Sequence, residues 1–276
     1  MKTRNKFFAG LFNLFFPGLG FLYIGRLKLA LMFPVLLWCV ICIGAWLRLI
    51  IHPVGFLTLV VTALLVFFGG IYLAVEMASQ QTEKVGKWFQ KWYIYIAFIV
   101  IFVTIGEVLL AGRAQLLGYE TFRISAGSMQ STLIRGDYII SNTWAYKGEQ
   151  PQRGDVAVLR YSKNDPSPYV VRVIGLPGEE VELLGAKIMI DGKQILEPYI
   201  DPANNTGELT DFPSVYLVPD GHYFVLADNR DLSIDSRQRG YVPLENIIGK
   251  TEFIFYSYSL DSTHGIRKER IGQVVE

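Results

Sequence analysis

Two short stretches of this sequence contain side chains that could carry out a reaction together. The first is Ser125-Ala126-Gly127-Ser128-Met129, in which a serine follows a glycine shortly after a long apolar run. A serine hydroxyl ionises poorly near neutral pH, so it becomes an effective nucleophile only beside a base. Alone, such a stretch is also typical of an ordinary turn. Its meaning therefore depends on what lies beside it.

The second stretch runs from Ala227 to Arg237 and reads ADNRDLSIDSR. Carboxylate, amide, hydroxyl and guanidinium side chains alternate here, after an apolar run. This composition is typical either of a solvated loop or of a buried polar network that fixes a site. Both interpretations are open from the sequence.

The N-terminal part of the chain has the composition of a membrane protein. Of the 276 residues 51% are apolar and only 18% are charged, whereas soluble domains carry about 25% charged residues. Three apolar stretches, 29–47, 54–75 and 93–111, have the length of about 20 residues that a membrane-spanning helix needs. A fourth stretch, 7–25, contains Pro17, Gly18 and Gly20. We expect a broken helix there, either re-entrant or spanning, because proline and glycine at membrane depth need neighbours that satisfy the backbone.

The distribution of charge predicts an orientation in the membrane. Residues 1–112 hold nine basic and three acidic residues, and the remainder holds 17 basic and 22 acidic residues. Three lysines lie between the last two clear spans, and basic residues favour the cytoplasmic side. Everything after residue 111 then lies outside the cytoplasm. We therefore predict a membrane domain at 1–112 and an outer domain at 113–276.

The outer half of the sequence predicts an all-β domain. Short apolar runs alternate with Gly, Pro, Asp and Asn, which is typical of strands separated by turns. At about 160 residues the domain is long enough to bury a core. It contains no cysteine, since Cys39 and Cys42 both lie in an apolar run of the first half, and no basic stripe suggests a nucleic-acid partner. The expected strands are 138–142, 155–161, 169–176, 187–190, 222–227 and 250–256.

Four motifs in this half occur in the order found in a known enzyme family. They are ISAGSMQSTLIRGDYII, RGDVAVLRY, YVVRVIGLPGEEVEL and GHYFVLADNRDLSIDSRQRGYVP, with GKTEFIFYS closing the domain. On these motifs the chain resembles signal peptidase I, a family of membrane-anchored serine endopeptidases that remove signal peptides from exported proteins. The resemblance covers residues 120–258 and implies transmembrane helices followed by an all-β extracytoplasmic domain. It also implies a bacterial inner (plasma) membrane, with the β domain on the periplasmic or extracellular side.

The resemblance implies a role for each motif residue. The family uses a serine and a lysine as its catalytic dyad. By motif, Ser128 is the nucleophile, and its backbone N–H is one donor to the oxyanion. The residues expected to hold the base and the surrounding loop are Ser233, Asp235 and Arg237, supported by Arg172, Asp228 and Asn229.

The lysine of the dyad is absent from this sequence. The family pattern Tyr-x-Lys-Arg appears here as Tyr169-Val170-Val171-Arg172, so Val171 occupies the base position and cannot accept a proton. Ser131 also replaces the family's usual proline. Two residues of the chain could replace the base. Lys163 lies eight residues earlier, roughly 26 Å along an extended strand, and His222 has suitable chemistry. A base from a partner chain is a further possibility.

Two functions remain open at this point. One is a working signal peptidase with an unorthodox base, acting on exported preproteins at Ala-x-Ala-like sites at the outer surface of the lipid bilayer. The alternative is an inactive relative that binds signal peptides or a membrane partner without cutting. A scaffold unrelated to the family is disfavoured by the four ordered motifs. Neither of the two functions calls for a metal ion or a cofactor, and the sequence predicts no oligomeric state.

Overall fold

The computed structural model describes residues 4–80, 88–162, 164–206, 214–259 and 265–276. The chain forms two compact units, Met1–Gly118 and Tyr119–Glu276. The division lies six residues after the boundary at 112 that we expected, because a short helix, α6 (Arg113–Leu116), follows the last long helix before the first strand begins. The two units are described separately below.

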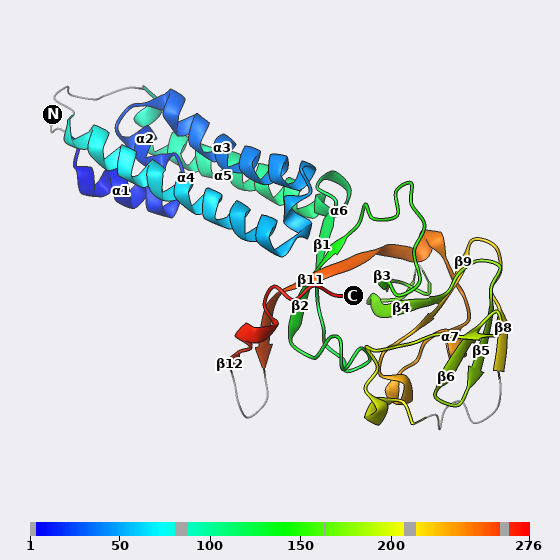
Figure 1. Cartoon of the computed structure of the whole chain (residues 1–276). Coiled ribbons are helices and arrows are strands. Elements are labelled where there is room, and N and C mark those ends of the chain that lie inside the picture. The colour runs from blue at the N-terminus through cyan, green and yellow to red at the C-terminus, as the bar shows by residue number, and fades with distance from the viewer. Residues whose placement is uncertain (1–3, 81–87, 163, 207–213, 260–264) are drawn as a thin grey trace. The chain divides into compact units, whose positions relative to one another are not determined.

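Among the described residues of the first unit, three helices are long and apolar enough to cross a membrane (Figure 1). Their limits differ from the predicted spans by a few residues at most, because a long run of apolar residues both predicts a span in the sequence and forms the helix in the structure. They are α3 (Leu27–Trp46), α4 (Pro53–Ser79) and α5 (Trp92–Ala111). Short 3₁₀ turns, Leu49–Ile51 and Trp88–Gln90, precede the last two.

The expected break in segment 7–25 separates helix α1 (Lys6–Phe15) from helix α2 (Leu19–Tyr23). Asn13 is buried, and its side-chain oxygen accepts hydrogen bonds from the backbone N–H groups of Gly18 at 2.8 Å and Gly20 at 3.2 Å. Gly18 has φ of +99°, and a Cβ there would lie 2.3 Å from the Ala30 carbonyl oxygen. At 1.5 Å per residue α1 is about 15 Å long, half the thickness of a bilayer core.

The second unit is built on a curved antiparallel sheet with the strand order β1-β2-β11-β3-β4-β9-β10, with β12 added beside β11 (Figure 1). Five of its strands overlap the predicted strands 138–142, 155–161, 169–176, 222–227 and 250–256, and their ends differ from the predicted ends by at most three residues. The bounds are β1 (Tyr119–Arg123), β2 (Asp137–Asn142), β3 (Val156–Leu159), β4 (Tyr169–Gly175), β9 (His222–Leu226), β10 (Val242–Pro243), β11 (Ile247–Ser259) and β12 (Gly265–Ile266).

A smaller sheet of four strands has the order β7-β6-β5-β8. Only β6 was expected from the sequence. An apolar cluster joins the two sheets, in which Val181, Leu183 and Ile188 of the smaller sheet pack against Ile174 and Phe224 of the larger one. The strands are β5 (Glu180–Leu184), β6 (Lys187–Ile190), β7 (Lys193–Gln194) and β8 (Ser214–Leu217).

The pleat of β3 and β4 divides the core of the larger sheet into two apolar clusters. Successive side chains of a strand point to opposite faces. Accordingly Val156 and Val158 pack in one cluster with Met129, whereas Ala157 and Val171 pack in the other. We call these the Met129 cluster and the Val171 cluster.

Candidate functional site

Residues 124–133 form most of the connection from β1 to β2, and their apolar side chains hold them against the core. We call them the nucleophile loop, after the role that the sequence predicts for Ser128. Met129 and Leu133 are almost fully buried in the Met129 cluster, and the Leu133 N–H donates to the Met129 carbonyl oxygen at 2.7 Å. Ser128, immediately before Met129, is half-buried. The anchoring of its neighbour therefore holds this serine at the edge of the core.

The polar stretch at 227–237 lies directly against this loop. The Ser128 carbonyl oxygen accepts hydrogen bonds from the Asn229 N–H at 2.9 Å and from the Ser233 hydroxyl at 3.2 Å. The Asn229 side-chain amide donates to the Gly127 carbonyl oxygen at 3.1 Å. These three hydrogen bonds are among those that join two stretches about a hundred residues apart in the sequence.

Most of the polar side chains at 227–237 are buried. Of the two interpretations drawn from the sequence, the buried network is the one that the structure shows. Only Asp231, the apolar residues Leu232 and Ile234, which are 81% and 62% exposed, and Arg237 are not among the buried residues. The buried polar members are Asp228, Asn229, Arg230, Ser233, Asp235 and Ser236.

Asp235 organises the end of this stretch. Its carboxylate accepts from the Arg237 guanidinium at 2.8 Å and from the Ala227 N–H at 3.1 Å. It also caps the short helix α7 (Ser236–Arg239) through the Arg237 backbone N–H. Arg237 in turn donates to the Arg230 carbonyl oxygen at 2.6 Å. These bonds close the stretch into a compact loop.

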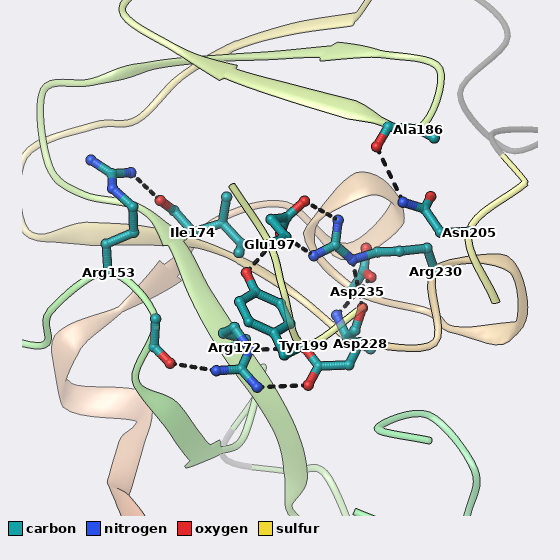
Figure 2. A network of polar contacts seen from close by, with 12 residues as sticks. Arg153, Arg172, Ile174, Ala186, Glu197, Tyr199, Asn205, Asp228, Arg230 and Asp235 are labelled. Atoms are coloured by element: carbon teal, nitrogen blue, oxygen red, sulfur yellow. Dashed lines mark hydrogen bonds and ion pairs between the residues drawn. The ribbon is translucent and has the colours of Figure 1, made fainter. Parts of the chain in front are cut away.

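A buried ion pair joins this loop to β4 (Figure 2). The Arg172 guanidinium donates to both carboxylate oxygens of Asp228, at 2.9 and 2.7 Å, and the two side chains are 1% and 0% exposed. Thr132 of the nucleophile loop donates to the same carboxylate at 2.5 Å. Arg172 also donates to the Gly154 carbonyl oxygen at 2.8 Å. Every charge of this buried pair therefore has a partner, as burial requires.

Val171, the residue before Arg172, is buried on the opposite face of β4. It packs in the Val171 cluster with apolar neighbours such as Leu159 and Val225. This cluster borders the polar loop, because the Val225 N–H donates to the Ser236 hydroxyl at 3.0 Å. Tyr161 packs against the same cluster, and its pKa is raised above the ordinary value by burial first and then by the Asp235 charge. Its phenol therefore stays protonated and supplies no base.

A family model described as signal peptidase, peptidase S26, matches residues 90–256. This chain belongs to that family. The matched residues contain the nucleophile loop, strand β4 and the polar loop. The whole candidate site therefore lies within the part of the chain that matches the family model.

Individual family members are similar over much of their length. Signal peptidase IB of Staphylococcus aureus is 32% identical over 179 residues, which cover 60% of this chain and 87% of that protein. Signal peptidase I of Rickettsia typhi is 28% identical over 238 residues, covering 65% of this chain and 84% of that protein. A crystal structure of a signal peptidase I from Enterococcus faecalis is 32% identical, with a TM-score of 0.33. It covers 37% of this chain and 97% of that one.

The structure does not bring His222, one of the two alternative bases, to Ser128. His222 begins β9, and its Nδ1 lies 2.9 Å from the Asp220 carbonyl oxygen. It is five residues before Ala227, about 17 Å along the strand. Lys163, the other alternative, lies outside the described residues. Among the described residues, no group of three or more His, Cys, Asp and Glu side chains could hold a metal ion.

Two residues that contact the site were not anticipated from the sequence. Glu197 binds Arg230, and Tyr199 stacks on Arg172 (Figure 2). Both come from the connection that follows β7, far from either motif in the sequence. The sequence signal nearest to them is the tripeptide Glu-Pro-Tyr at 197–199, shortly after the predicted strand 187–190, and such a tripeptide predicts no contact by itself.

Proposed function

We propose that this chain is a slow signal peptidase, an endopeptidase that removes N-terminal signal peptides from exported proteins at Ala-x-Ala-like sites, with Ser128 as its nucleophile. The observation that carries the proposal is the attachment of the Ser128 loop to the buried polar loop at 227–237. Family membership supports the same activity. The comparisons do not favour the alternative of an inactive relative.

The bonds to the nucleophile loop support a specific role for the backbone. The Gly127 carbonyl and the Ser128 N–H belong to one planar peptide group and point in opposite directions. Because the Asn229 amide holds the Gly127 carbonyl oxygen at 3.1 Å, it also fixes the direction of the Ser128 N–H. We assign this N–H as a donor to the oxyanion that forms when the Ser128 hydroxyl attacks the scissile carbonyl. A preorganised donor of this kind contributes roughly 10²–10³-fold to the rate.

The absence of a base at position 171 explains why we propose a slow enzyme. A positioned base contributes about 10²–10⁴-fold. In the proposed reaction the hydroxyl proton of Ser128 leaves to hydroxide from the solvent as the Ser128 oxygen bonds to the carbonyl carbon. The water formed in this way protonates the nitrogen as the C–N bond breaks, which releases the new N-terminus, restores hydroxide and leaves the acyl-enzyme. A second water then hydrolyses the ester, which frees the carboxyl end of the signal peptide and restores the Ser128 hydroxyl. Cleavage by the natural protein should therefore rise with pH without a plateau.

The test compares four forms of the full-length protein in detergent, from pH 6 to 10, on a preprotein with an Ala-x-Ala site. We expect slow cleavage by the natural protein and none by Ser128→Ala. Val171→Lys should be faster by about 10²–10⁴-fold and should reach a plateau above the lysine pKa, which burial lowers. Val171→Met, similar in length but without a base, should match the natural protein.

Each other result has a definite meaning. If the natural protein is silent and Val171→Lys is active, the natural form is an inactive relative with an otherwise complete site. If neither the natural protein nor Val171→Lys cleaves a substrate that a known signal peptidase cuts, the assignment of Ser128 as the nucleophile is wrong. A plateau near neutral pH in the natural protein would reveal a base within the chain, and Lys163→Ala would be examined next.

We also propose that the chain spans the membrane several times, with the β domain on the outer side of a bacterial plasma membrane. The lysine-rich connection before α5 supports this orientation, since basic loops favour the cytoplasm. Protease added to intact spheroplasts should degrade the β domain. Protection of that domain would reverse the orientation.

A further inference from the structure

The connection that follows β7 places a carboxylate on one of the site's arginines. One carboxylate oxygen of Glu197 lies 2.5 Å from Arg230 Nη2, and the other lies 3.3 Å from Arg230 Nη1. The two side chains are 9% and 5% exposed. Two parallel hydrogen bonds to one guanidinium fix its plane as well as its position. Glu197 therefore determines how Arg230 is held.

Two residues further on, the same connection places an aromatic ring on the other arginine. The Arg172 guanidinium lies 3.7 Å from the centre of the Tyr199 ring, which is a cation–π contact. The Tyr199 hydroxyl donates to Glu197 Oε1 at 2.7 Å. Burial first, and then the Glu197 charge, raise the Tyr199 pKa, so this hydroxyl remains a donor.

Both arginines hold the beginning of the polar loop, as Figure 2 shows. Arg230 Nε donates to the Ala227 carbonyl oxygen at 2.8 Å, and Arg172 binds the Asp228 carboxylate. The next residue, Asn229, carries the bonds to Gly127 and Ser128. A chain of direct contacts thus leads from the Glu-Pro-Tyr segment to the nucleophile.

A third contact links this segment to the nucleophile loop itself. The Ser131 hydroxyl donates to the Tyr199 carbonyl oxygen at 2.9 Å. Ser131 has φ of +95°, which is rare and strained for a residue other than glycine. Such a conformation persists only when its surroundings hold it in place, and the bond to Tyr199 is one contact that does so.

We propose that Glu197 and Tyr199 are positioning residues that fix the nucleophile loop against the polar loop and so set the direction of the Ser128 backbone N–H. They act through Arg230, Arg172 and Ser131. The kinetic part of this inference rests on the proposed function, whereas the fixing of the two loops does not. The apolar cluster that joins the smaller sheet to Ile174 and Phe224 of the larger sheet includes neither Glu197 nor Tyr199, so strands β5 and β6 should stay folded when either side chain is replaced.

The experiment measures cleavage and local hydrogen exchange on the full-length chain in detergent. The variants are Glu197→Ala, Glu197→Gln, Tyr199→Leu and Tyr199→Phe. Cleavage is followed in the natural protein and in the Val171→Lys background, with kcat and KM determined separately. Hydrogen exchange reports the amides of segments 127–133 and 227–230. The matched control is Glu180→Ala, which removes an exposed carboxylate from β5 of the smaller sheet.

We expect Glu197→Ala and Tyr199→Leu to lower kcat by at least about tenfold with KM nearly unchanged, because misplacement of a catalytic group costs turnover. Exchange in the two segments should rise by a similar factor while strands β5 and β6 stay protected. Glu197→Gln and Tyr199→Phe should fall between these variants and the natural protein, since each keeps part of the contact. Glu180→Ala should change nothing.

Unchanged kcat and unchanged exchange in Glu197→Ala and Tyr199→Leu would overturn the positioning role while leaving the proposed function intact. Loss of protection throughout both sheets would also overturn it, because the contact would then be a general support of the fold. If neither the natural protein nor Val171→Lys cleaves, the proposed function fails. The exchange measurement still decides the inference in that case.

Discussion

The buried pair of Arg172 and Asp228 allows a quantitative test of the site's architecture. In Asp228→Asn the side chain keeps its shape and loses its charge. Arg172 is 1% exposed and cannot release its proton, so it would remain as a buried cation without a counter-charge. Its bond to the Gly154 carbonyl oxygen and its contact with the Tyr199 ring remain, but neither of these groups carries a charge.

The expected cost follows from this geometry. Removing one partner of a buried ion pair destabilises a protein by about 3–5 kcal/mol. A fold of this kind has a total stability of about 5–15 kcal/mol. In a unit of this size each kcal/mol lowers the Tm by about 2–4 °C, so the Tm of Asp228→Asn should fall by roughly 6–20 °C.

The assay is scanning calorimetry of the full-length chain in detergent, with Arg172→Met and the double variant as companions. Removing both charges takes away the unpaired cation, so the double variant should melt no lower than Asp228→Asn. Arg172→Met alone leaves Asp228 as a buried carboxylate without a counter-charge, so its Tm should fall by a similar amount.

Two results would refute the reasoning. An Asp228→Asn Tm within about 2 °C of the natural protein, less than the effect of one kcal/mol, would mean that the pair is not buried as described. A double variant whose loss equals the sum of the two single losses would mean that the two residues do not interact.

Three further expectations come from other parts of the fold. Ser131→Pro should lower the Tm, although proline is the family's usual residue there, because proline fixes φ near −65° while Ser131 has φ of +95°. Ser131→Gly should cost less, and a proline variant as stable as the natural protein would contradict this backbone conformation. Three phenols are those whose pKa values burial raises most, so in calorimetry stability should fall above pH 10 by up to about 1.4 kcal/mol per pH unit for each, and Phe variants should flatten the fall. These phenols belong to Tyr146, Tyr161 and Tyr199. Asn13→Leu should leave two buried N–H groups unpaired, at about 1–3 kcal/mol each, and lower the resistance of the helical unit to unfolding by detergent; no change would mean that water reaches this turn.

Much of the architecture could be predicted from local sequence. The three long helices follow from apolar length alone, and five strands of the larger sheet follow from apolar runs between turn residues. Strand β1 was not anticipated because its sequence, YETFR, is partly exposed and charged. It is a strand because it pairs with β2 over five residues, and such pairing is not visible in a local window of sequence.

The sequence predicted the two loops of the site, the nucleophile loop and the polar loop, but not the contacts that hold them together. The polar stretch at 227–237 is compatible with a solvated loop or a buried network, and only the fold shows which groups find partners. The contacts of Glu197 and Tyr199 depend on a connection from another sheet. Their distance from the motifs in the sequence carries no information about their distance in space.

The arrangement of β4 explains how Val171 can occupy the position where the motif predicts the family's lysine while the site stays ordered. Val171 and Arg172 are neighbours on one strand, so their side chains leave its opposite faces. Arg172 is committed to Asp228 and the polar loop, whereas Val171 belongs to an apolar cluster on the other side. A change at position 171 therefore alters the chemistry available there without removing any bond that holds Ser128 in place. This is why we expect Val171→Lys to add a base to a site whose loops are already positioned.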